Sequence, residues 1–257
     1  MEEIGGSTLA VRPLTEAVSR LEPHACHVWT AWRTDAGPRL HRLLDGAELA
    51  RLEMMRRPVE QERFVVGCAL TRTALAGYLG RPLVAVRLSR RCPRCSRPHG
   101  KPHLAADLRP QIHWSTSYAG DLLLVAFALD TPLGVDVEEL APVFPVDGIA
   151  RLALTMHERS ALCQFGATER TQGLLRYWVR KEAIAKATGE GLRLPFSKLT
   201  VSGPDELPRL LCWPDQQPLE RVALYDLKVG VAHLASLAVL SGPRLPIMLD
   251  GSALLRR

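Results

Sequence analysis

Two carboxylates interrupt an otherwise apolar stretch at residues 134–138, and this interruption limits how the chain can fold. The stretch reads Gly-Val-Asp-Val-Glu and has the alternation typical of a β-strand. Because successive side chains of a strand point to opposite faces, Asp136 and Glu138 share one face while the valines take the other. Gly134 allows a bend or the close approach of another segment. The stretch therefore predicts a strand that presents two carboxylates on one side.

A second charged stretch lies at residues 178–186, which read Trp-Val-Arg-Lys-Glu-Ala-Ile-Ala-Lys. It belongs to a longer pattern, 172–188, that is typical of a helix. Residues four apart stack on one side of a helix. Trp178, Glu182 and Lys186 are therefore expected to share a face.

If this helical face lies over the strand, Asp136, Glu138 and Glu182 converge. Three carboxylates do not stay ionised together without a cation, and oxygen-only ligands favour Mg²⁺, which also binds substrate phosphates. Lys186, one turn away, would pair with a phosphate oxygen. The alternative is an exposed strand end and an ordinary salt bridge from Glu182 to Lys186. Each motif alone favours that alternative, but the two together favour the metal and phosphate site.

The remaining pattern predicts a mixture of helices and strands, and 257 residues suffice for one large domain or two small ones. An amphipathic helix is expected at 60–79, and two strands at 112–117 and 122–129 are joined around Gly120 and Asp121. Residues 62–82 and 177–195 both run helix, glycine, arginine, proline. This weak repeat indicates two similar halves, each with a long helix on a small sheet. Residues 241–257 are expected to form a poorly ordered basic tail.

Composition describes an ordinary soluble globular protein, with 47% hydrophobic and 23% charged residues. The longest apolar runs, 122–129 and 229–240, are too short or too interrupted to span a bilayer. The N-terminal residues 1–4 are acidic, unlike a signal peptide. A cytoplasmic location with cysteine thiols is therefore expected. The formal net charge of +6 suits an anionic partner, or it reflects a GC-rich genome that uses Arg in place of Lys.

One loop contains Cys92 and Cys95 followed by His99 and His103. The spacing of the cysteines suits zinc, and the histidines would complete four ligands. Flanking Pro and Arg residues favour a loop with unligated thiols over a redox site at a helix terminus. We therefore expect thiols rather than zinc at Cys92 and Cys95.

The two charged motifs resemble those of the Sfp-type 4′-phosphopantetheinyl transferases. The hallmark of that family is G-x-D-x-E, followed downstream by W-x-x-K-E-A/S-x-x-K. Further similarities extend in order over residues 40–202. They are Glu62-Arg63-Phe64 with Gly67, Gly100-Lys101-Pro102, the turn from Ser117 to Gly120, Gly189-Glu190-Gly191-Leu192, and Leu194-Pro195-Phe196.

The resemblance implies two α+β halves related by pseudo-twofold symmetry, with mostly antiparallel sheets and an active-site cleft between them. Residues 1–118 would form the half that holds the 3′-phosphate of coenzyme A, and residues 119–240 the half with the magnesium and catalytic motifs. The implied reaction moves the phosphopantetheine arm of coenzyme A to a serine of an acidic acyl or peptidyl carrier protein and releases 3′,5′-ADP. Such enzymes serve fatty acid, polyketide or nonribosomal peptide synthesis, the last two in secondary metabolism. The internal duplication implies a monomer. Neither a membrane nor a nucleic acid is expected as a partner.

The resemblance also implies residue roles near the reacting phosphates. Asp136, Glu138 and Glu182 would hold Mg²⁺, and Asp136 and Lys186 would contact coenzyme A. Lys186 would stabilise the leaving phosphate. Glu182 would act either as a metal ligand or as a general base. Arg180, before Lys181, is a departure from the family pattern and would reach the carrier or the phosphates.

Other implied contacts concern the nucleotide and the carrier. Arg63 and Lys101 would hold the 3′-phosphate of coenzyme A, with Arg51 as a third candidate that is otherwise a solvated side chain. Ser117 would contact the nucleotide end. Tyr118 stands where the family commonly has histidine, so it would donate to a phosphate without carrying a positive charge. The proposed carrier contacts, which would otherwise form a packed loop, are Val143, Phe144 and Arg151.

Two other functions remain open from the sequence. A basic nucleic-acid-binding protein is suggested by the net charge and the Arg-rich residues 87–97, although only 5% of residues are aromatic and base stacking needs such rings. The other is an inactive relative that binds coenzyme A. The presence of Asp136, Glu182 and Lys186 argues against an inactive relative.

Overall fold

The structure is a computed structural model of the 257-residue chain. It describes residues 20–91, 95, 97, 100–105, 111–140, 146–214 and 221–256, except for the side chains of 168 and 192.

The first half is built on a four-stranded sheet in the order β11-β1-β5-β4. Its strands are β1 (Ala25–Trp32), β4 (Ile112–Ala119), β5 (Leu122–Leu129) and β11 (Leu245–Asp250). β4 and β5 form the predicted antiparallel hairpin, which turns at Gly120 with φ of +53°. β1 pairs antiparallel with β5 and parallel with β11.

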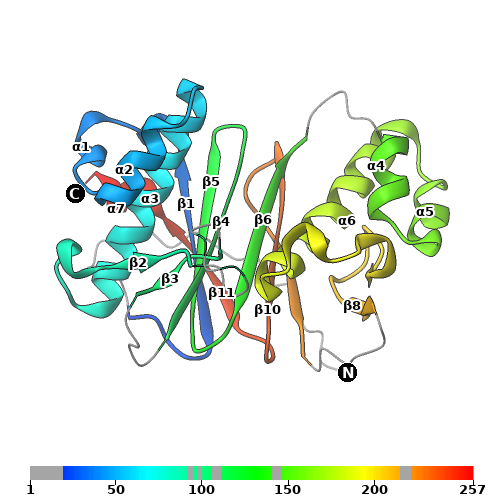
Figure 1. The fold of residues 1–257 in the computed structure, drawn as a ribbon. Helices are drawn as coiled ribbons and strands as arrows, with labels where there is room; N and C mark the ends of the chain where they lie inside the picture. The colour runs from blue at the N-terminus through cyan, green and yellow to red at the C-terminus, as the bar shows by residue number, and fades with distance from the viewer. Residues whose placement is uncertain are drawn as a thin grey trace.

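A long helix, α3 (Pro58–Leu79), covers this sheet (Figure 1). It buries Val65, Val66, Leu70 and other apolar side chains against the sheet. The helix ends at Gly80, which adopts the left-handed conformation that glycine accepts at low cost. Three short helices accompany it: α1 (Pro38–His41), α2 (Gly46–Glu53) and α7 (Gly251–Leu255).

The second half has an antiparallel sheet in the order β6-β10-β9, formed by β6 (Leu133–Glu139), β9 (Ala223–Leu227) and β10 (His233–Val239). Helix α6 (Ala167–Thr188) packs on it, again ending at a left-handed glycine, Gly189. The other elements of the described residues are α4 (Val146–Ala153), α5 (Met156–Leu162), β2 (Leu88–Ser89), β3 (His103–Leu104), β7 (Thr200–Val201), β8 (Leu210–Cys212) and the 3₁₀ turns η1 (Arg33–Asp35), η2 (Leu83–Ala85), η3 (Gly191–Arg193) and η4 (Phe196–Lys198).

The expected α+β fold of two similar halves is confirmed: each half has a 22-residue helix on a small, mostly antiparallel sheet. The two sheets share an apolar core between β5, β6 and β10. Serine hydroxyls of β4 also join the halves. Ser115 accepts a hydrogen bond from the backbone of Val135 at 3.1 Å, and Ser117 accepts one from Val137 at 3.3 Å.

The structure differs from the expected domain limits in two places. Because β5 pairs with both β1 and β4, residues 119–129 belong to the first sheet, and the second sheet begins at β6. Residues 241–257 were expected to be a poorly ordered tail, but 245–250 form β11 and 251–255 form α7, beside β1 and α3. Alternation over so short a segment did not reveal a strand whose partner lies more than 200 residues earlier. No helix within the described ranges is long and apolar enough to cross a membrane.

Candidate active site

Asp136 lies in the middle of β6 and is only 4% exposed. Its Oδ1 accepts hydrogen bonds from Ser117 Oγ at 2.9 Å and from Lys186 Nζ at 2.6 Å. Burial raises the pKa of Asp136, while the ammonium of Lys186 opposes this rise. The second carboxylate oxygen, Oδ2, is buried and has no hydrogen-bond partner among the described residues. One oxygen of a buried carboxylate is therefore held by the protein, and the other is left for a ligand.

Glu138 and Glu182 lie close enough to Asp136 for their charges to interact. Burial, the negative charge of Asp136 and, less strongly, that of Glu182 raise the pKa of Glu138 to about 7, against the hydrogen bond from Trp178 Nε1 at 3.1 Å. Burial and Asp136 also raise the pKa of Glu182. The strand and helix motifs thus meet through three mutually repelling carboxylates and Lys186. No three described His, Cys, Asp or Glu side chains are already arranged around a metal position.

Gly134 permits this meeting of strand and helix. A Cβ atom there would lie 2.1 Å from the carbonyl oxygen of Ala183 and 2.4 Å from the amide nitrogen of Ala187. The expected close approach at Gly134 is therefore that of the α6 backbone. Only a residue without a side chain lets β6 and α6 come this close.

Gly134→Ala is expected to reduce the free energy of unfolding by about 1–3 kcal/mol, because the added methyl group clashes with backbone atoms that cannot rotate away. Urea denaturation measures the change. Gly148→Ala in α4 is the matched control, since a Cβ there meets nothing within 4 Å. Equal stability of the two variants would contradict the packing argument.

The raised pKa of Glu138 predicts a pH-dependent loss of stability in metal-free protein. The folded-state pKa of about 7 exceeds the ordinary value of 4.5. The stabilising contribution of the protonated group is therefore full below about 4.5 and lost as the pH rises through about 7. Glu138→Gln should raise Tm relative to wild type more at about pH 8 than at about pH 5, in buffer without divalent cations. The same difference in Tm at both pH values would disprove this reading.

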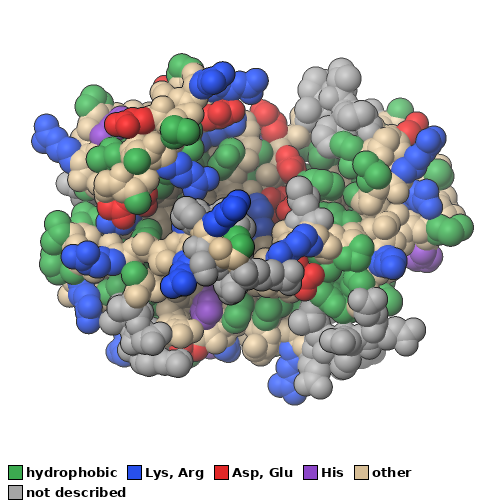
Figure 2. Space-filling model, viewed as in Figure 1, with side chains coloured by type: hydrophobic (Ala, Val, Ile, Leu, Met, Phe, Trp, Pro, Cys, Tyr) green, Lys and Arg blue, Asp and Glu red, His purple; other side chains and the backbone are tan. Residues whose placement is uncertain are grey.

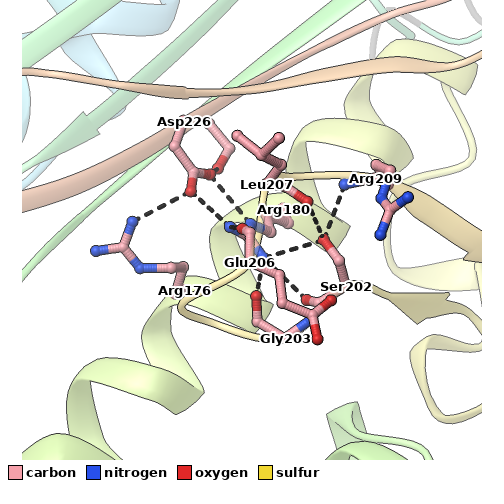
Figure 3. A network of polar contacts seen from close by, with 9 residues as sticks. Arg176, Arg180, Ser202, Gly203, Glu206, Leu207, Arg209 and Asp226 are labelled. Carbon is pink, nitrogen blue, oxygen red and sulfur yellow. Dashed lines mark hydrogen bonds and ion pairs between the residues drawn. The ribbon is translucent and has the colours of Figure 1, made fainter. Parts of the chain in front are cut away.

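Arg180 does not reach a carrier or a phosphate, which corrects the expectation from the sequence. It is fully buried, and its guanidinium binds Asp226 with Nη2–Oδ2 and Nε–Oδ1 distances of 2.6 and 3.1 Å. It also donates to the carbonyls of Ser202, Gly203 and Glu206 (Figure 3). Arg180 thus fixes α6 to β9 and to the loop after β7. Sequence spacing placed Arg180 on the helix but did not show what covers that face.

Lys181 is also fully buried, on the side of α6 away from the carboxylates. Its Nζ lies 2.5 Å from Glu158 Oε2 and donates to the carbonyls of Ala153 and Phe196 at 2.8 and 2.9 Å. Glu158 also forms a capping box with Thr155 at the start of α5. Lys181 therefore anchors the helix, whereas Glu182 and Lys186 face the site.

Two adjoining pockets lie over β4, one within the first half and one between the two halves. One, of about 330 Å³, is bordered by α2, α3 and β4 and includes Arg51, Arg63 and Tyr118. The other, of about 290 Å³, includes Lys101 and reaches Lys186 at the end of α6. The residues that line both pockets are Arg90, Pro102, Trp114 and Thr116.

The two pockets share lining residues and so form one cleft, which reaches Lys186, the partner of Asp136. Figure 2 shows basic side chains gathered around the hollow between the halves, with acidic side chains along its upper edge. This distribution of charge suits an anionic ligand that reaches from the arginines to the carboxylates.

The first pocket contains three arginines. The Arg63 guanidinium lies over the Tyr118 ring, 5.4 Å from its centroid, and donates to the carbonyl of Gly120. Arg51 lies over the ring of Phe64, also at 5.4 Å. Tyr118 is 52% exposed, so its hydroxyl is accessible at the edge of the cleft. The structure brings Arg51, Arg63 and Tyr118 together as expected for an anion-binding pocket, although their contact with a phosphate stays a prediction.

Arg90 was not identified from the sequence. Burial and the nearby Arg51 lower its pKa. In the sequence Arg90 belongs to an arginine-rich loop with no periodicity. Only the contact of that loop with β4 and α3 places it in the cleft.

In the structure, Lys101 and Ser117 both bind other groups of the protein. Lys101 donates to the carbonyls of Leu133, Lys186 and Ala187 at 2.8, 2.8 and 3.4 Å. Burial lowers its pKa to about 8. Ser117 accepts from Lys186 Nζ at 2.9 Å and donates to Asp136. Ser117 thus belongs to the carboxylate cluster, while Lys101 joins backbone segments.

Some residues of the cysteine–histidine loop and of the expected carrier contact lie outside the described residues. They are Cys92, His99, Val143 and Phe144. Cys95 and His103 are described and are exposed.

Comparison with known proteins agrees with the geometry of the site. Residues 132–236 match the family model of the 4′-phosphopantetheinyl transferase superfamily. The 4′-phosphopantetheinyl transferase HetI of Nostoc sp. (strain PCC 7120) is 29% identical over 150 residues, which are 58% of this chain and 61% of the relative. The chain thus spans about three fifths of the length of this curated relative.

Solved structures show weaker similarity. The holo-[acyl-carrier-protein] synthase of Thermotoga maritima aligns with a TM-score of 0.35 and 23% identity, covering 44% of this chain and 64% of that chain. The holo-(acyl-carrier-protein) synthase of Bacillus anthracis, in complex with CoA (3′,5′-ADP), aligns with a TM-score of 0.34 and 24% identity, covering 42% and 94%. At TM-scores below 0.5, neither structure supports a conclusion about this chain.

The matched segment contains both charged motifs and every carboxylate of the cluster. The resemblance seen in the motifs is thus confirmed: residues 132–236 of this chain match the model of the 4′-phosphopantetheinyl transferase superfamily.

Proposed function

We propose that the protein transfers the phosphopantetheine arm of coenzyme A to a serine of an apo acyl or peptidyl carrier protein and releases 3′,5′-ADP. The observation that supports this most directly is the cluster of Asp136, Glu138, Glu182 and Lys186 at the end of a basic cleft. A diphosphate substrate needs cations along its length and an electrostatic partner where negative charge grows. The cleft and the cluster together offer both.

The donor chemistry of the carboxylate cluster suits Mg²⁺. All its donors are oxygens, which Mg²⁺ prefers, and Asp136 Oδ2 is buried without a hydrogen-bond partner among the described residues. We propose Asp136 and Glu138 as residues that hold the ion, with Glu182 as either a third ligand or the general base. When bound, Mg²⁺ supplies positive charge to the diphosphate oxygens.

The protein groups account for binding, orientation and proton transfer. The hydroxyl oxygen of the carrier serine forms a bond to the phosphorus that bears pantetheine, and the bond from that phosphorus to the bridging oxygen breaks. Glu182, whose pKa is raised, accepts the serine proton directly or through water if it is not a metal ligand. Lys186 stabilises the charge on the departing 3′,5′-ADP phosphate.

Incubation with Mg²⁺, coenzyme A and an apo-carrier protein tests the proposal by intact mass. The expected result is a carrier heavier by one phosphopantetheine group, and no change when EDTA replaces Mg²⁺. Coenzyme A binding without transfer would instead indicate an inactive relative. Salt-sensitive retention of DNA, with no mass change, would favour a nucleic-acid-binding protein. The cytoplasmic location, the monomeric state and a role in secondary metabolism stay predictions.

A carrier contact is proposed at Arg151 on α4. Arg151 is exposed and lines a pocket of about 350 Å³ together with Arg159 and Arg170. An acidic carrier helix would complement these charges. Arg151→Glu should raise the KM for the carrier by about tenfold and leave the KM for coenzyme A unchanged. Arg87→Glu, an exposed arginine elsewhere, is the control; an equal effect of both variants would reject a specific contact.

A further inference from the structure

Lys101 has an unusual set of partners for a side chain beside an anion-binding cleft. It is partly buried, and its ammonium donates to three backbone carbonyls, those of Leu133, Lys186 and Ala187. An ammonium has three donors, so these contacts use its full capacity. A phosphate would have to displace them.

The three carbonyls belong to the two segments that carry the charged motifs. Lys186 and Ala187 lie in the last turn of α6, where helix carbonyls lack intrahelical partners and the helix dipole is negative. Leu133 is the first residue of β6. One positive charge therefore satisfies the end of α6 and joins it to the start of β6.

The same two segments carry the closest pair of charges in the site. Lys186 is bound by Lys101 through its backbone carbonyl, and its side chain reaches Asp136 Oδ1 at 2.6 Å. A shift of α6 along β6 would lengthen that contact. Gly134 lets the two backbones approach, but contact alone does not prevent sliding; a three-point hydrogen bond does.

We propose that Lys101 is a positioning residue that fixes the end of α6 on β6, so that Lys186 and the carboxylates keep their relative places, and that it does not bind the 3′-phosphate of coenzyme A. The proposal rests on the proposed transferase function and reassigns a residue that the family resemblance placed on the nucleotide. Recognition of the 3′-phosphate then depends on the arginines of the cleft, Arg51, Arg63 and Arg90.

Comparison of coenzyme A with dephospho-coenzyme A, which lacks the 3′-phosphate, separates the two roles. Lys101→Met should lower kcat by about 10- to 100-fold with both donors, because a small displacement of reacting groups is costly. The ratio of kcat/KM for coenzyme A to kcat/KM for dephospho-coenzyme A should stay at the wild-type value. Arg63→Met should instead reduce that ratio, and Lys228→Met, an exposed lysine after β9, should change nothing. A Lys101→Met variant that loses activity with coenzyme A alone overturns the proposal.

Amide hydrogen exchange tests the same inference without catalysis. In Lys101→Met, exchange should accelerate in peptides covering residues 133–137 and 184–189, and not in α3. Unchanged exchange in these peptides overturns the proposal, whether or not the wild type is active. If exchange accelerates but the wild type proves inactive, only the transferase function fails. Lys101→Gln, which keeps amide donors but not the charge, replaces Lys101→Met if the latter does not fold.

Discussion

Lys186→Met is expected to lower kcat for carrier modification by about 10²- to 10³-fold, the range seen when one group that stabilises developing charge is removed. Lys186 Nζ contacts Asp136 Oδ1 at 2.6 Å and Ser117 Oγ at 2.9 Å. It is therefore held at the end of the cleft, where the diphosphate would break. Methionine keeps the length of the side chain but supplies no charge. The KM for coenzyme A should change less than kcat, because the arginines of the other pocket remain.

Steady-state rates with an apo-carrier protein measure this effect, with Lys228→Met as the control. The Tm of Lys186→Met must be recorded as well, because Asp136 loses its cation in the variant. A Lys186→Met protein that is folded and transfers within about threefold of the wild-type rate would remove Lys186 from the proposed chemistry.

Lys181→Met is expected to lower the free energy of unfolding by about 3–5 kcal/mol, since it leaves a buried carboxylate without its cation. Glu158 and Lys181 are both fully buried, with Nζ and Oε2 2.5 Å apart. Glu158 also accepts from the backbone of Val201 at 2.9 Å, so it joins α5, α6 and β7. Losing one partner therefore affects three elements.

Chemical denaturation measures the loss, and a double-mutant cycle assigns it. Glu158→Gln alone and the pair Glu158→Gln with Lys181→Met complete the cycle; the double variant should be less destabilised than the sum of the single variants. The folded fraction of Lys181→Met should retain kcat, unlike Lys186→Met, although the two lysines are five residues apart. A Lys181→Met protein within about 1 kcal/mol of wild type would show that the pair contributes little.

Local geometry accounts for what was correct about the site before the fold was known. Asp136 and Glu138 share one face of a strand, and Trp178, Glu182 and Lys186 share one face of a helix. Both placements follow from the periods of a strand and a helix. In the structure, Trp178 donates to Glu138 and Lys186 to Asp136. The motif spacing therefore identified the facing side chains, and glycine at position 134 indicated their close approach.

The family resemblance could transfer residue types but not their surroundings. Lys101 occupies a motif position and Arg180 a variable one, and phosphate or carrier contacts were expected for both. Carboxylates and carbonyls distant in sequence instead take up their donors. Arg90 carried no motif and lies in the cleft. A charged side chain binds whatever acceptor the fold brings near, and spacing along the chain does not specify that acceptor.

By itself, the sequence determined the α+β class, the two long helices, the β4–β5 hairpin and the set of charged residues that share a face. These features depend on short-range periodicity and turn chemistry. Only the tertiary structure decided that β11 joins β1 from the far end of the chain and that Lys101 ties α6 to β6. Such contacts arise from long-range packing, where a buried donor must find an acceptor and many sequence-distant partners are equally compatible with the local pattern.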